Sequence, residues 1–90
     1  MQRVEVRITG RVQGVGFRQF AHDRARRLGL KGWVRNERDG SVRAVAEGDE
    51  HAIDQWLQAV GSGPPLARVD DVDVRRETAS GMFRSFEIAH

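Results

Sequence analysis

The segment RVEVRITGRVQGVGFRQFAHDRARRLGL (residues 3–30) changes its hydrophobic period part-way along, and this change indicates how the chain folds. From Arg3 to Thr9, polar and apolar residues alternate, which is typical of a strand with one buried face. After three closely spaced glycines, apolar residues recur at helical spacing from Phe17 to Leu28. The segment therefore predicts a strand, a glycine-rich loop and a helix.

The next part of the chain predicts a hairpin. Residues 31–37 and 41–47 are both rich in strand-forming residues. They flank Asp39 and Gly40, a pair that favours a type I′ turn because both central positions of that turn require positive φ. Asn36 is expected near the tip of this hairpin.

A second helix and two further strands complete the pattern. Gly48, Asp49 and Glu50 open the helix and Gly61 closes it. Strands are predicted at residues 69–76 and 83–88, and the large apolar residues expected in the core are Phe17, Phe20, Trp33 and Trp56. The order βαββαβ plus a C-terminal strand predicts an α+β, ferredoxin-like sandwich. Such a sandwich has two helices on one face of a mostly antiparallel sheet.

Length and composition narrow the protein class. Ninety residues make one domain, residues 1–90, and the absence of cysteine excludes disulfide frameworks, zinc fingers and thiol nucleophiles. No apolar stretch is long enough to cross a membrane, and 15 basic against 13 acidic residues give no excess charge that would indicate nucleic acid. We expect a cytoplasmic monomer with neither a membrane nor a nucleic-acid partner.

The start of the first predicted helix carries charge of the unfavourable sign. Arg18 stands there, Gly16 precedes it, and no acidic residue follows until Asp23. A cation is disfavoured at this end, because the unpaired N–H groups of a helix N-terminus are already positive. Glycines in the preceding loop allow several N–H groups to converge, so the pattern predicts a site for phosphate or sulfate. The alternative is a tight strand-to-helix turn with a solvated Arg18. The loop lacks the Gly-Lys-Ser/Thr ending of a Walker A motif, so the sequence gives little support to nucleotide binding.

Two stretches of sequence resemble the signatures of the acylphosphatase family. The first is GRVQGVGFR (residues 10–18), and the second is GWVRN (32–36) followed by DGSV (39–42) and EG (47–48). The resemblance covers nearly the whole chain. It implies a ferredoxin-like fold and a metal-independent, cofactor-free hydrolysis of acyl phosphates to a carboxylate and inorganic phosphate.

The resemblance also implies roles for individual residues. Arg18 matches the family's phosphate-binding arginine and Asn36 its water-positioning asparagine, so these two are the predicted catalytic residues. The predicted phosphate-binding residues are Arg11, Val12, Gln13, Gly14, Val15, Gly16, Phe17 and Arg18, through loop N–H groups and the Arg18 guanidinium. The expected partners are a small acyl phosphate as substrate and inorganic phosphate or sulfate as inhibitor.

General chemistry agrees with this small set of residues. The leaving group of an acyl phosphate is a carboxylate whose conjugate acid has a pKa of about 4, so no general acid is required. The planar fork of arginine can hold two phosphate oxygens, and arginine does not deprotonate. An asparagine amide is no base at neutral pH, but its oxygen can accept a proton from water and fix the line of attack.

Each candidate also has a plainer interpretation. Asparagine beside a turn ordinarily bonds the local backbone, and His22 is expected on the solvated surface of its helix. His51 and His90 are given no role. Asp70, Asp71 and Asp73 do not predict a metal site, because alternation along a strand places only two of them on one face.

Two other classes of protein share the predicted fold. Some RNA-binding modules stack bases on exposed strand aromatics, but this chain has no tyrosine and no strand with alternating aromatic and basic residues. The other class is an accessory domain of a larger maturation enzyme, which would keep the fold without turnover. Release of phosphate from an acyl phosphate distinguishes the enzyme from both.

Overall fold

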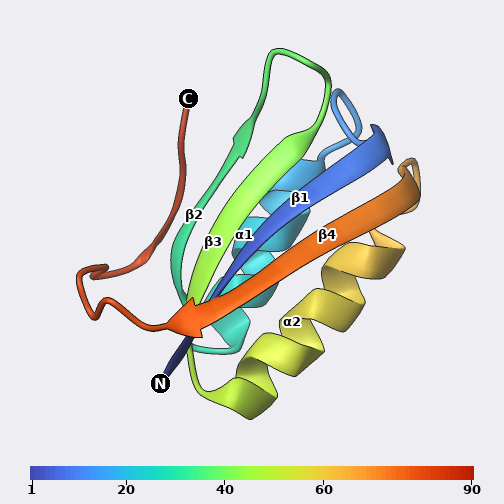
Figure 1. The fold of residues 1–90 in the computed structure, drawn as a ribbon. Coiled ribbons are helices and arrows are strands. Elements are labelled where there is room, and N and C mark those ends of the chain that lie inside the picture. Colours follow the sequence, from blue (N-terminus) through green and yellow to red (C-terminus); the bar gives the residue numbers. More distant parts are fainter.

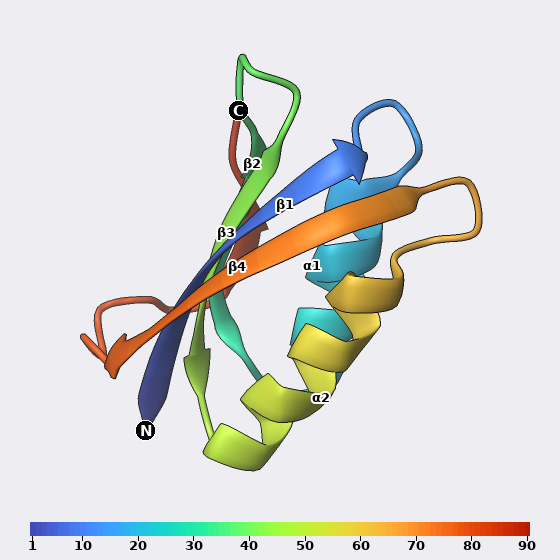
Figure 2. The same cartoon turned by 45° about the vertical axis from the view of Figure 1, so that its right-hand side comes forward.

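The computed structural model describes residues 1–90 as a five-stranded sheet with two helices (Figure 1). In chain order the elements are β1 (Gln2–Arg11), α1 (Phe17–Arg27), β2 (Lys31–Asn36), β3 (Val42–Gly48), α2 (Glu50–Ser62), β4 (Arg68–Thr78) and β5 (Phe86–Ile88). The strand order is β4-β1-β3-β2-β5, and every pair is antiparallel except β2 with β5. Both helices cover the same face of the sheet (Figure 2). The predicted ferredoxin-like fold with an extra C-terminal strand is confirmed.

One hydrophobic core lies between the sheet and the helices. Alternate residues of β1, Val4, Val6 and Ile8, are fully buried, as the period of two requires. The buried residues that the helices contribute are Phe17, Ala21, Ala25, Ile53, Trp56 and Val60. The Trp56 indole also donates from Nε1 to the carbonyl of Ala21 at 3.0 Å, so that its one polar atom links α2 to α1.

Two aromatic residues predicted in the core lie at its edge or outside it. Trp33 is only half-buried, because its neighbours Gly32 and Val34 face the core and strand alternation turns Trp33 to the open face of the sheet. The Arg35 guanidinium covers its ring at 4.7 Å from the centroid. Phe20 is also half-buried. For both residues the prediction of a core position was wrong.

The predicted type I′ turn was wrong as well. Gly40 has φ +93°, but no residue other than glycine has positive φ. Asp39 therefore lacks the positive φ that a type I′ turn requires at both central positions. The chain instead forms a β-turn in which the Gly40 N–H donates to the carbonyl of Glu37 at 3.2 Å. The Asp39 carboxylate then accepts from the N–H of Ser41 at 2.9 Å and from its hydroxyl at 2.6 Å.

The ends of three elements differ from the prediction. Helix α2 continues through Gly61 to Ser62 and ends at Gly63, whose φ of +72° breaks the helix. Strand β4 is longer than the predicted residues 69–76, and β5 contains only Phe86–Ile88 of the predicted residues 83–88. The residues before β5 form a loop that is held by a buried carboxylate.

This carboxylate belongs to Glu47, which is only 5% exposed on β3. It accepts hydrogen bonds from the N–H and hydroxyl of Ser80, both at 2.8 Å, and from the N–H of Gly81 at 3.0 Å. Arg3 adds an ion pair at 3.3 Å. Burial alone would raise the pKa of Glu47, but the bonds from Ser80, Gly81 and Arg3 outweigh it and hold that pKa below its ordinary value.

We expect Glu47→Gln to weaken the pH dependence of stability. A carboxylate whose pKa is lower in the folded than in the unfolded state stabilises the fold above the unfolded value, and this contribution is lost as pH falls through the folded pKa. The free energy of unfolding, measured in urea at several pH values below neutrality, should therefore decline less steeply with acid in Glu47→Gln than in the wild type. Identical acid slopes would show that Glu47 contributes nothing through its charge.

Candidate functional site

The predicted phosphate-binding loop joins β1 to α1 after an irregularity in the sheet. The register of β1 with β4 shifts between Thr9 and Gly10. Gly10 has φ +125°, and a Cβ built there would lie 2.2 Å from the carbonyl oxygen of Arg68. Only glycine permits this close approach, which directs the chain off β1 and into the loop.

The loop and the first turn of α1 present backbone N–H groups that have no acceptor in the protein. None of the N–H groups of residues 12–19 donates to the backbone, and the first bond at this end runs from Phe20 to the carbonyl of Gly16 at 3.1 Å. The N-cap residue of α1 is Gly16, in the left-handed conformation, and no side chain bonds to the N–H groups of the first turn. The first turn of α1 also contains no acidic residue. This end of the helix is therefore positive and suited to an anion.

Arg18 adds a formal charge to this end. It lies in the first turn of α1 and is half-buried. The ion pairs of the molecule involve other arginines, among them Arg3, Arg7, Arg35, Arg43, Arg68 and Arg76. Because no carboxylate neutralises Arg18, its guanidinium retains its positive charge for a ligand.

Asn36 is the last residue of β2, on the helix-covered face. Its Oδ1 is buried and has no hydrogen-bond partner. An orphaned buried acceptor costs about 1–3 kcal/mol, so it calls for an explanation. The local bonding expected of a turn asparagine is performed by Asp39, which accepts from Ser41. Arg7 also pairs with Asp39, and these bonds, those from Ser41 first, lower the pKa of Asp39 to about 2.

A cavity of about 430 Å³ brings the predicted catalytic residues together. Its lining residues are Val12, Gly14, Gly16, Phe17, Arg18, Gln19, Asn36, Ile88 and His90. Arg18 and Asn36 thus face one space that the glycine loop also borders. Of the other predicted phosphate-binding residues, Arg11, Gln13 and Val15 do not line the cavity.

His90 in the cavity wall was not expected from the sequence. The parallel register places Ile88 beside Val34, and the N–H of Ala89 continues the pairing by donating to the carbonyl of Val34 at 2.8 Å. Phe86, Ile88 and His90 stand two residues apart, so alternation turns all three to the helix-covered face. That spacing was the available signal, but the parallel pairing with β2 could not be read from it.

His22 also differs from its predicted position on the solvated helix surface. Its side chain is only 16% exposed. Its ring packs against the ring of Phe86 with centroids 6.2 Å apart, and its Nδ1 lies 2.9 Å from the Asp23 carboxylate. His22 therefore contributes to packing between α1 and β5.

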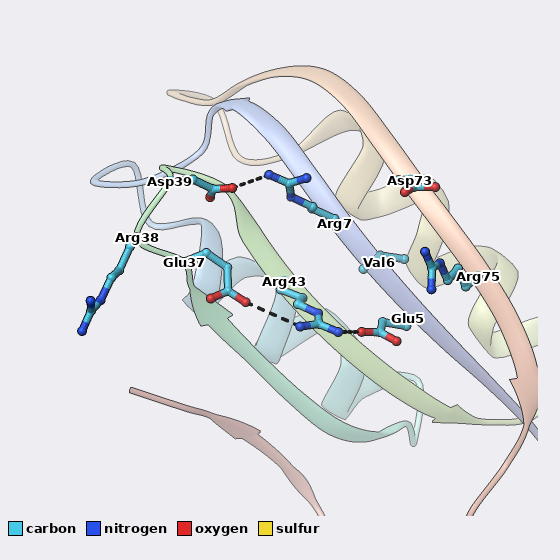
Figure 3. Close-up of a pocket in the computed structure, with 9 residues that line it drawn as sticks. All are labelled: Glu5, Val6, Arg7, Glu37, Arg38, Asp39, Arg43, Asp73 and Arg75. Carbon is cyan, nitrogen blue, oxygen red and sulfur yellow. Dashed lines mark hydrogen bonds and ion pairs between the residues drawn. The ribbon is translucent and has the colours of Figure 1, made fainter.

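The largest pocket lies on the opposite, open face of the sheet, and its lining contains equal numbers of basic and acidic residues (Figure 3). It measures about 650 Å³ and is lined by four arginines and four acidic residues, together with Val6. Arg43 pairs with Glu5 and Glu37, and Arg7 pairs with Asp39. Since the four acidic residues equal the four arginines in number, and two of the arginines are paired, this pocket does not favour an anion.

No three histidine or acidic side chains are grouped so that they could hold a metal ion. In particular, the acidic run on β4, which contains Asp70, Asp71 and Asp73, forms no such group. No helix has the length and apolar character needed to cross a membrane.

Comparison with known proteins identifies the family. A family model described as acylphosphatase matches residues 4–88. The chain belongs to the acylphosphatase family. The acylphosphatase of Salinibacter ruber is 55% identical over 87 residues, which cover 97% of this chain and 92% of that protein. The crystal structure of acylphosphatase from Bacillus subtilis covers 100% of both chains with a TM-score of 0.97 and 38% identity.

The acylphosphatase fold also occurs within a longer protein. A crystal structure of full-length HypF, in its phosphate- and nucleotide-bound form, matches 99% of this chain with a TM-score of 0.87 and 29% identity. The match covers only 12% of the HypF chain. The Salinibacter acylphosphatase, in contrast, is matched along almost its whole length.

Proposed function

We propose that this chain hydrolyses acyl phosphates to a carboxylate and inorganic phosphate without a metal ion. The N–H groups of the 11–17 loop and the Arg18 guanidinium hold the phosphoryl group, and Asn36 positions the attacking water. The observation that carries the proposal is the Asn36 side chain, which lines the same cavity as Arg18 and whose buried Oδ1 lacks a hydrogen-bond partner. A water molecule between Asn36 and a bound phosphoryl group would satisfy this acceptor.

The charges of the site suit phosphoryl transfer. The phosphoryl oxygens carry the charge that develops in the transition state, and fixed N–H groups and a guanidinium stabilise it without having to reorganise. Arg18 can donate two parallel hydrogen bonds to two of these oxygens. The loop N–H groups and the positive end of α1 contact the remaining oxygens.

The bond changes need no further catalytic group. Water held by Asn36 Oδ1 attacks phosphorus, the bond from phosphorus to the acyl oxygen breaks, and a carboxylate leaves. The proton of the attacking water passes to a phosphate oxygen. Because the carboxylate is a weak base, it departs without protonation.

The activity is tested with benzoyl phosphate in the presence of EDTA. We expect the purified protein to release inorganic phosphate and benzoate in equal amounts, at a rate that EDTA does not change. Binding of phosphate without turnover would favour an accessory domain. Turnover that EDTA abolishes would contradict the metal-independent mechanism.

Inorganic phosphate should stabilise the fold through the same site. A ligand that binds only the folded state stabilises it by RT ln(1 + [L]/Kd), which is about 1.4 kcal/mol at ten times Kd. In a domain of this size such a gain raises the melting temperature by several degrees. We expect the shift in the wild type and its loss in Arg18→Ala, measured by thermal unfolding against phosphate concentration. An equal shift in both proteins would refute binding at Arg18.

A further inference from the structure

The Gln13 side chain connects the phosphate-binding loop to the hairpin that carries Asn36. Its Nε2 donates to the carbonyl of Glu37 at 2.7 Å and to that of Ser41 at 2.9 Å. Both protons of the amide are therefore used on one hairpin, across sequence separations of 24 and 28 residues. Gln13 is half-buried, and no other side chain of the loop forms such a bond.

The two carbonyls lie at the ends of the turn next to Asn36. Asn36 is the last residue of β2 and pairs with Val42, so Glu37 and Ser41 are the first residues beyond the sheet on each side. They also bond to each other, from the N–H of Glu37 to the carbonyl of Ser41 at 2.9 Å. Fixing the carbonyl of Glu37 therefore fixes the orientation of the chain immediately after Asn36.

The hairpin is held from its other face by different residues. There Arg7 pairs with Asp39, and Arg43 pairs with Glu37 (Figure 3). Arg7 belongs to β1 and Arg43 to β3, so these two arginines connect the turn to the sheet and not to the loop. Of the side chains that hold the hairpin, Gln13 is the one that connects it to the anion-binding loop.

We infer that Gln13 is a positioning residue that holds Asn36 at the correct distance from the phosphoryl group; the inference rests on the function proposed above. The loop N–H groups fix phosphorus, and Asn36 fixes the water that attacks it. The two groups come from different elements, and the Gln13 amide sets the distance between them. A displacement of about 1 Å in reacting groups can cost 10²-fold in rate, so one such connection is enough to matter.

Gln13→Met tests this role, because methionine has a similar length and no donor. The backbone N–H of residue 13 is retained, so the inhibition constant of phosphate should change by less than about threefold. The rate constant kcat for benzoyl phosphate should fall by about tenfold, since a displaced Asn36 no longer aligns the water. Gln58→Met, a matched change at an exposed position of α2, should leave both constants unchanged.

A double-mutant cycle with Asn36→Ala separates positioning from general weakening of the fold. If Gln13 acts through Asn36, Gln13→Met should lower kcat in the wild type but have no further effect in Asn36→Ala. Gln13→Glu, which keeps the size and replaces both donors with acceptors, should lower kcat at least as much as Gln13→Met. If Gln13→Met does not fold, Gln13→Glu takes its place in the measurement of kcat.

Three results would overturn the inference. They are wild-type kcat in both Gln13 variants, a loss of phosphate inhibition in parallel with kcat in the uncharged variant Gln13→Met, and multiplicative effects of Gln13→Met and Asn36→Ala. Failure of the proposed function looks different, because Asn36→Ala alone would then turn over at the wild-type rate. That result would remove the role of Asn36 and with it the role inferred for Gln13.

Discussion

Arg18→Ala is expected to lower kcat/KM for benzoyl phosphate by about 10³-fold or more, the largest effect of any single substitution in this chain. Losing an arginine or a preorganised donor that contacts a transferring group typically costs 10²–10⁵-fold. Arg18 has no ion pair to lose within the protein, so the folded structure should persist. Steady-state kinetics together with circular dichroism measure both quantities.

Arg18→Lys distinguishes the planar fork from its charge. Lysine keeps the positive charge but cannot donate two parallel hydrogen bonds to a phosphoryl group. We expect this variant to be nearly as inactive as Arg18→Ala. Arg26→Ala, a change at an exposed position of the same helix, should have near-normal kinetics. Near-wild-type kcat/KM in Arg18→Lys would show that charge alone is sufficient.

Asn36→Ala is expected to lower kcat and kcat/KM together by about 10²-fold, or about 2.7 kcal/mol of transition-state stabilisation. In the mechanism that we propose, the amide contacts the attacking water, so its loss should affect the transition state more than substrate binding. Inhibition by phosphate should persist, because Arg18 and the loop N–H groups remain. Gln55→Ala, which removes an exposed amide from α2, is the control.

The same substitution gives the opposite result if Asn36 is only a turn residue. Asn36→Ala would then melt at a lower temperature and keep its turnover per folded molecule. The structure makes this outcome unexpected, since Asp39 forms the local bonds of the turn and Asn36 Oδ1 forms none. A destabilised variant with unchanged kcat would nevertheless remove Asn36 from the mechanism.

The fold could be predicted from the sequence because its signals are local. The alternation in β1 and the helical spacing in α1 and α2 each lie within one short segment. The positive start of α1 was visible for the same reason, because Arg18 and the lack of an acidic residue in the first turn can be read from neighbouring positions.

The parts that were missed depend on contacts between distant segments. Alternation indicates that the Trp33 side chain points to the face of the sheet opposite to that of Val34. Which of these two faces is covered depends on helices elsewhere in the chain. His90 enters the cavity only because β5 pairs in parallel with β2. The Gln13 side chain likewise reaches a hairpin that begins more than twenty residues later. No spacing in the sequence encodes these contacts.

In the mechanism that we propose, water held by Asn36 attacks phosphorus while the loop and Arg18 hold the phosphoryl group. Hydrolysis of benzoyl phosphate in water labelled with oxygen-18 tests it directly, because the label marks the atom that was attacked. Attack at phosphorus places one labelled oxygen in the inorganic phosphate and none in the benzoate, and this is the expected result from mass spectrometry of both products. Label in the benzoate would mean attack at the acyl carbon and would contradict the assignment of the site.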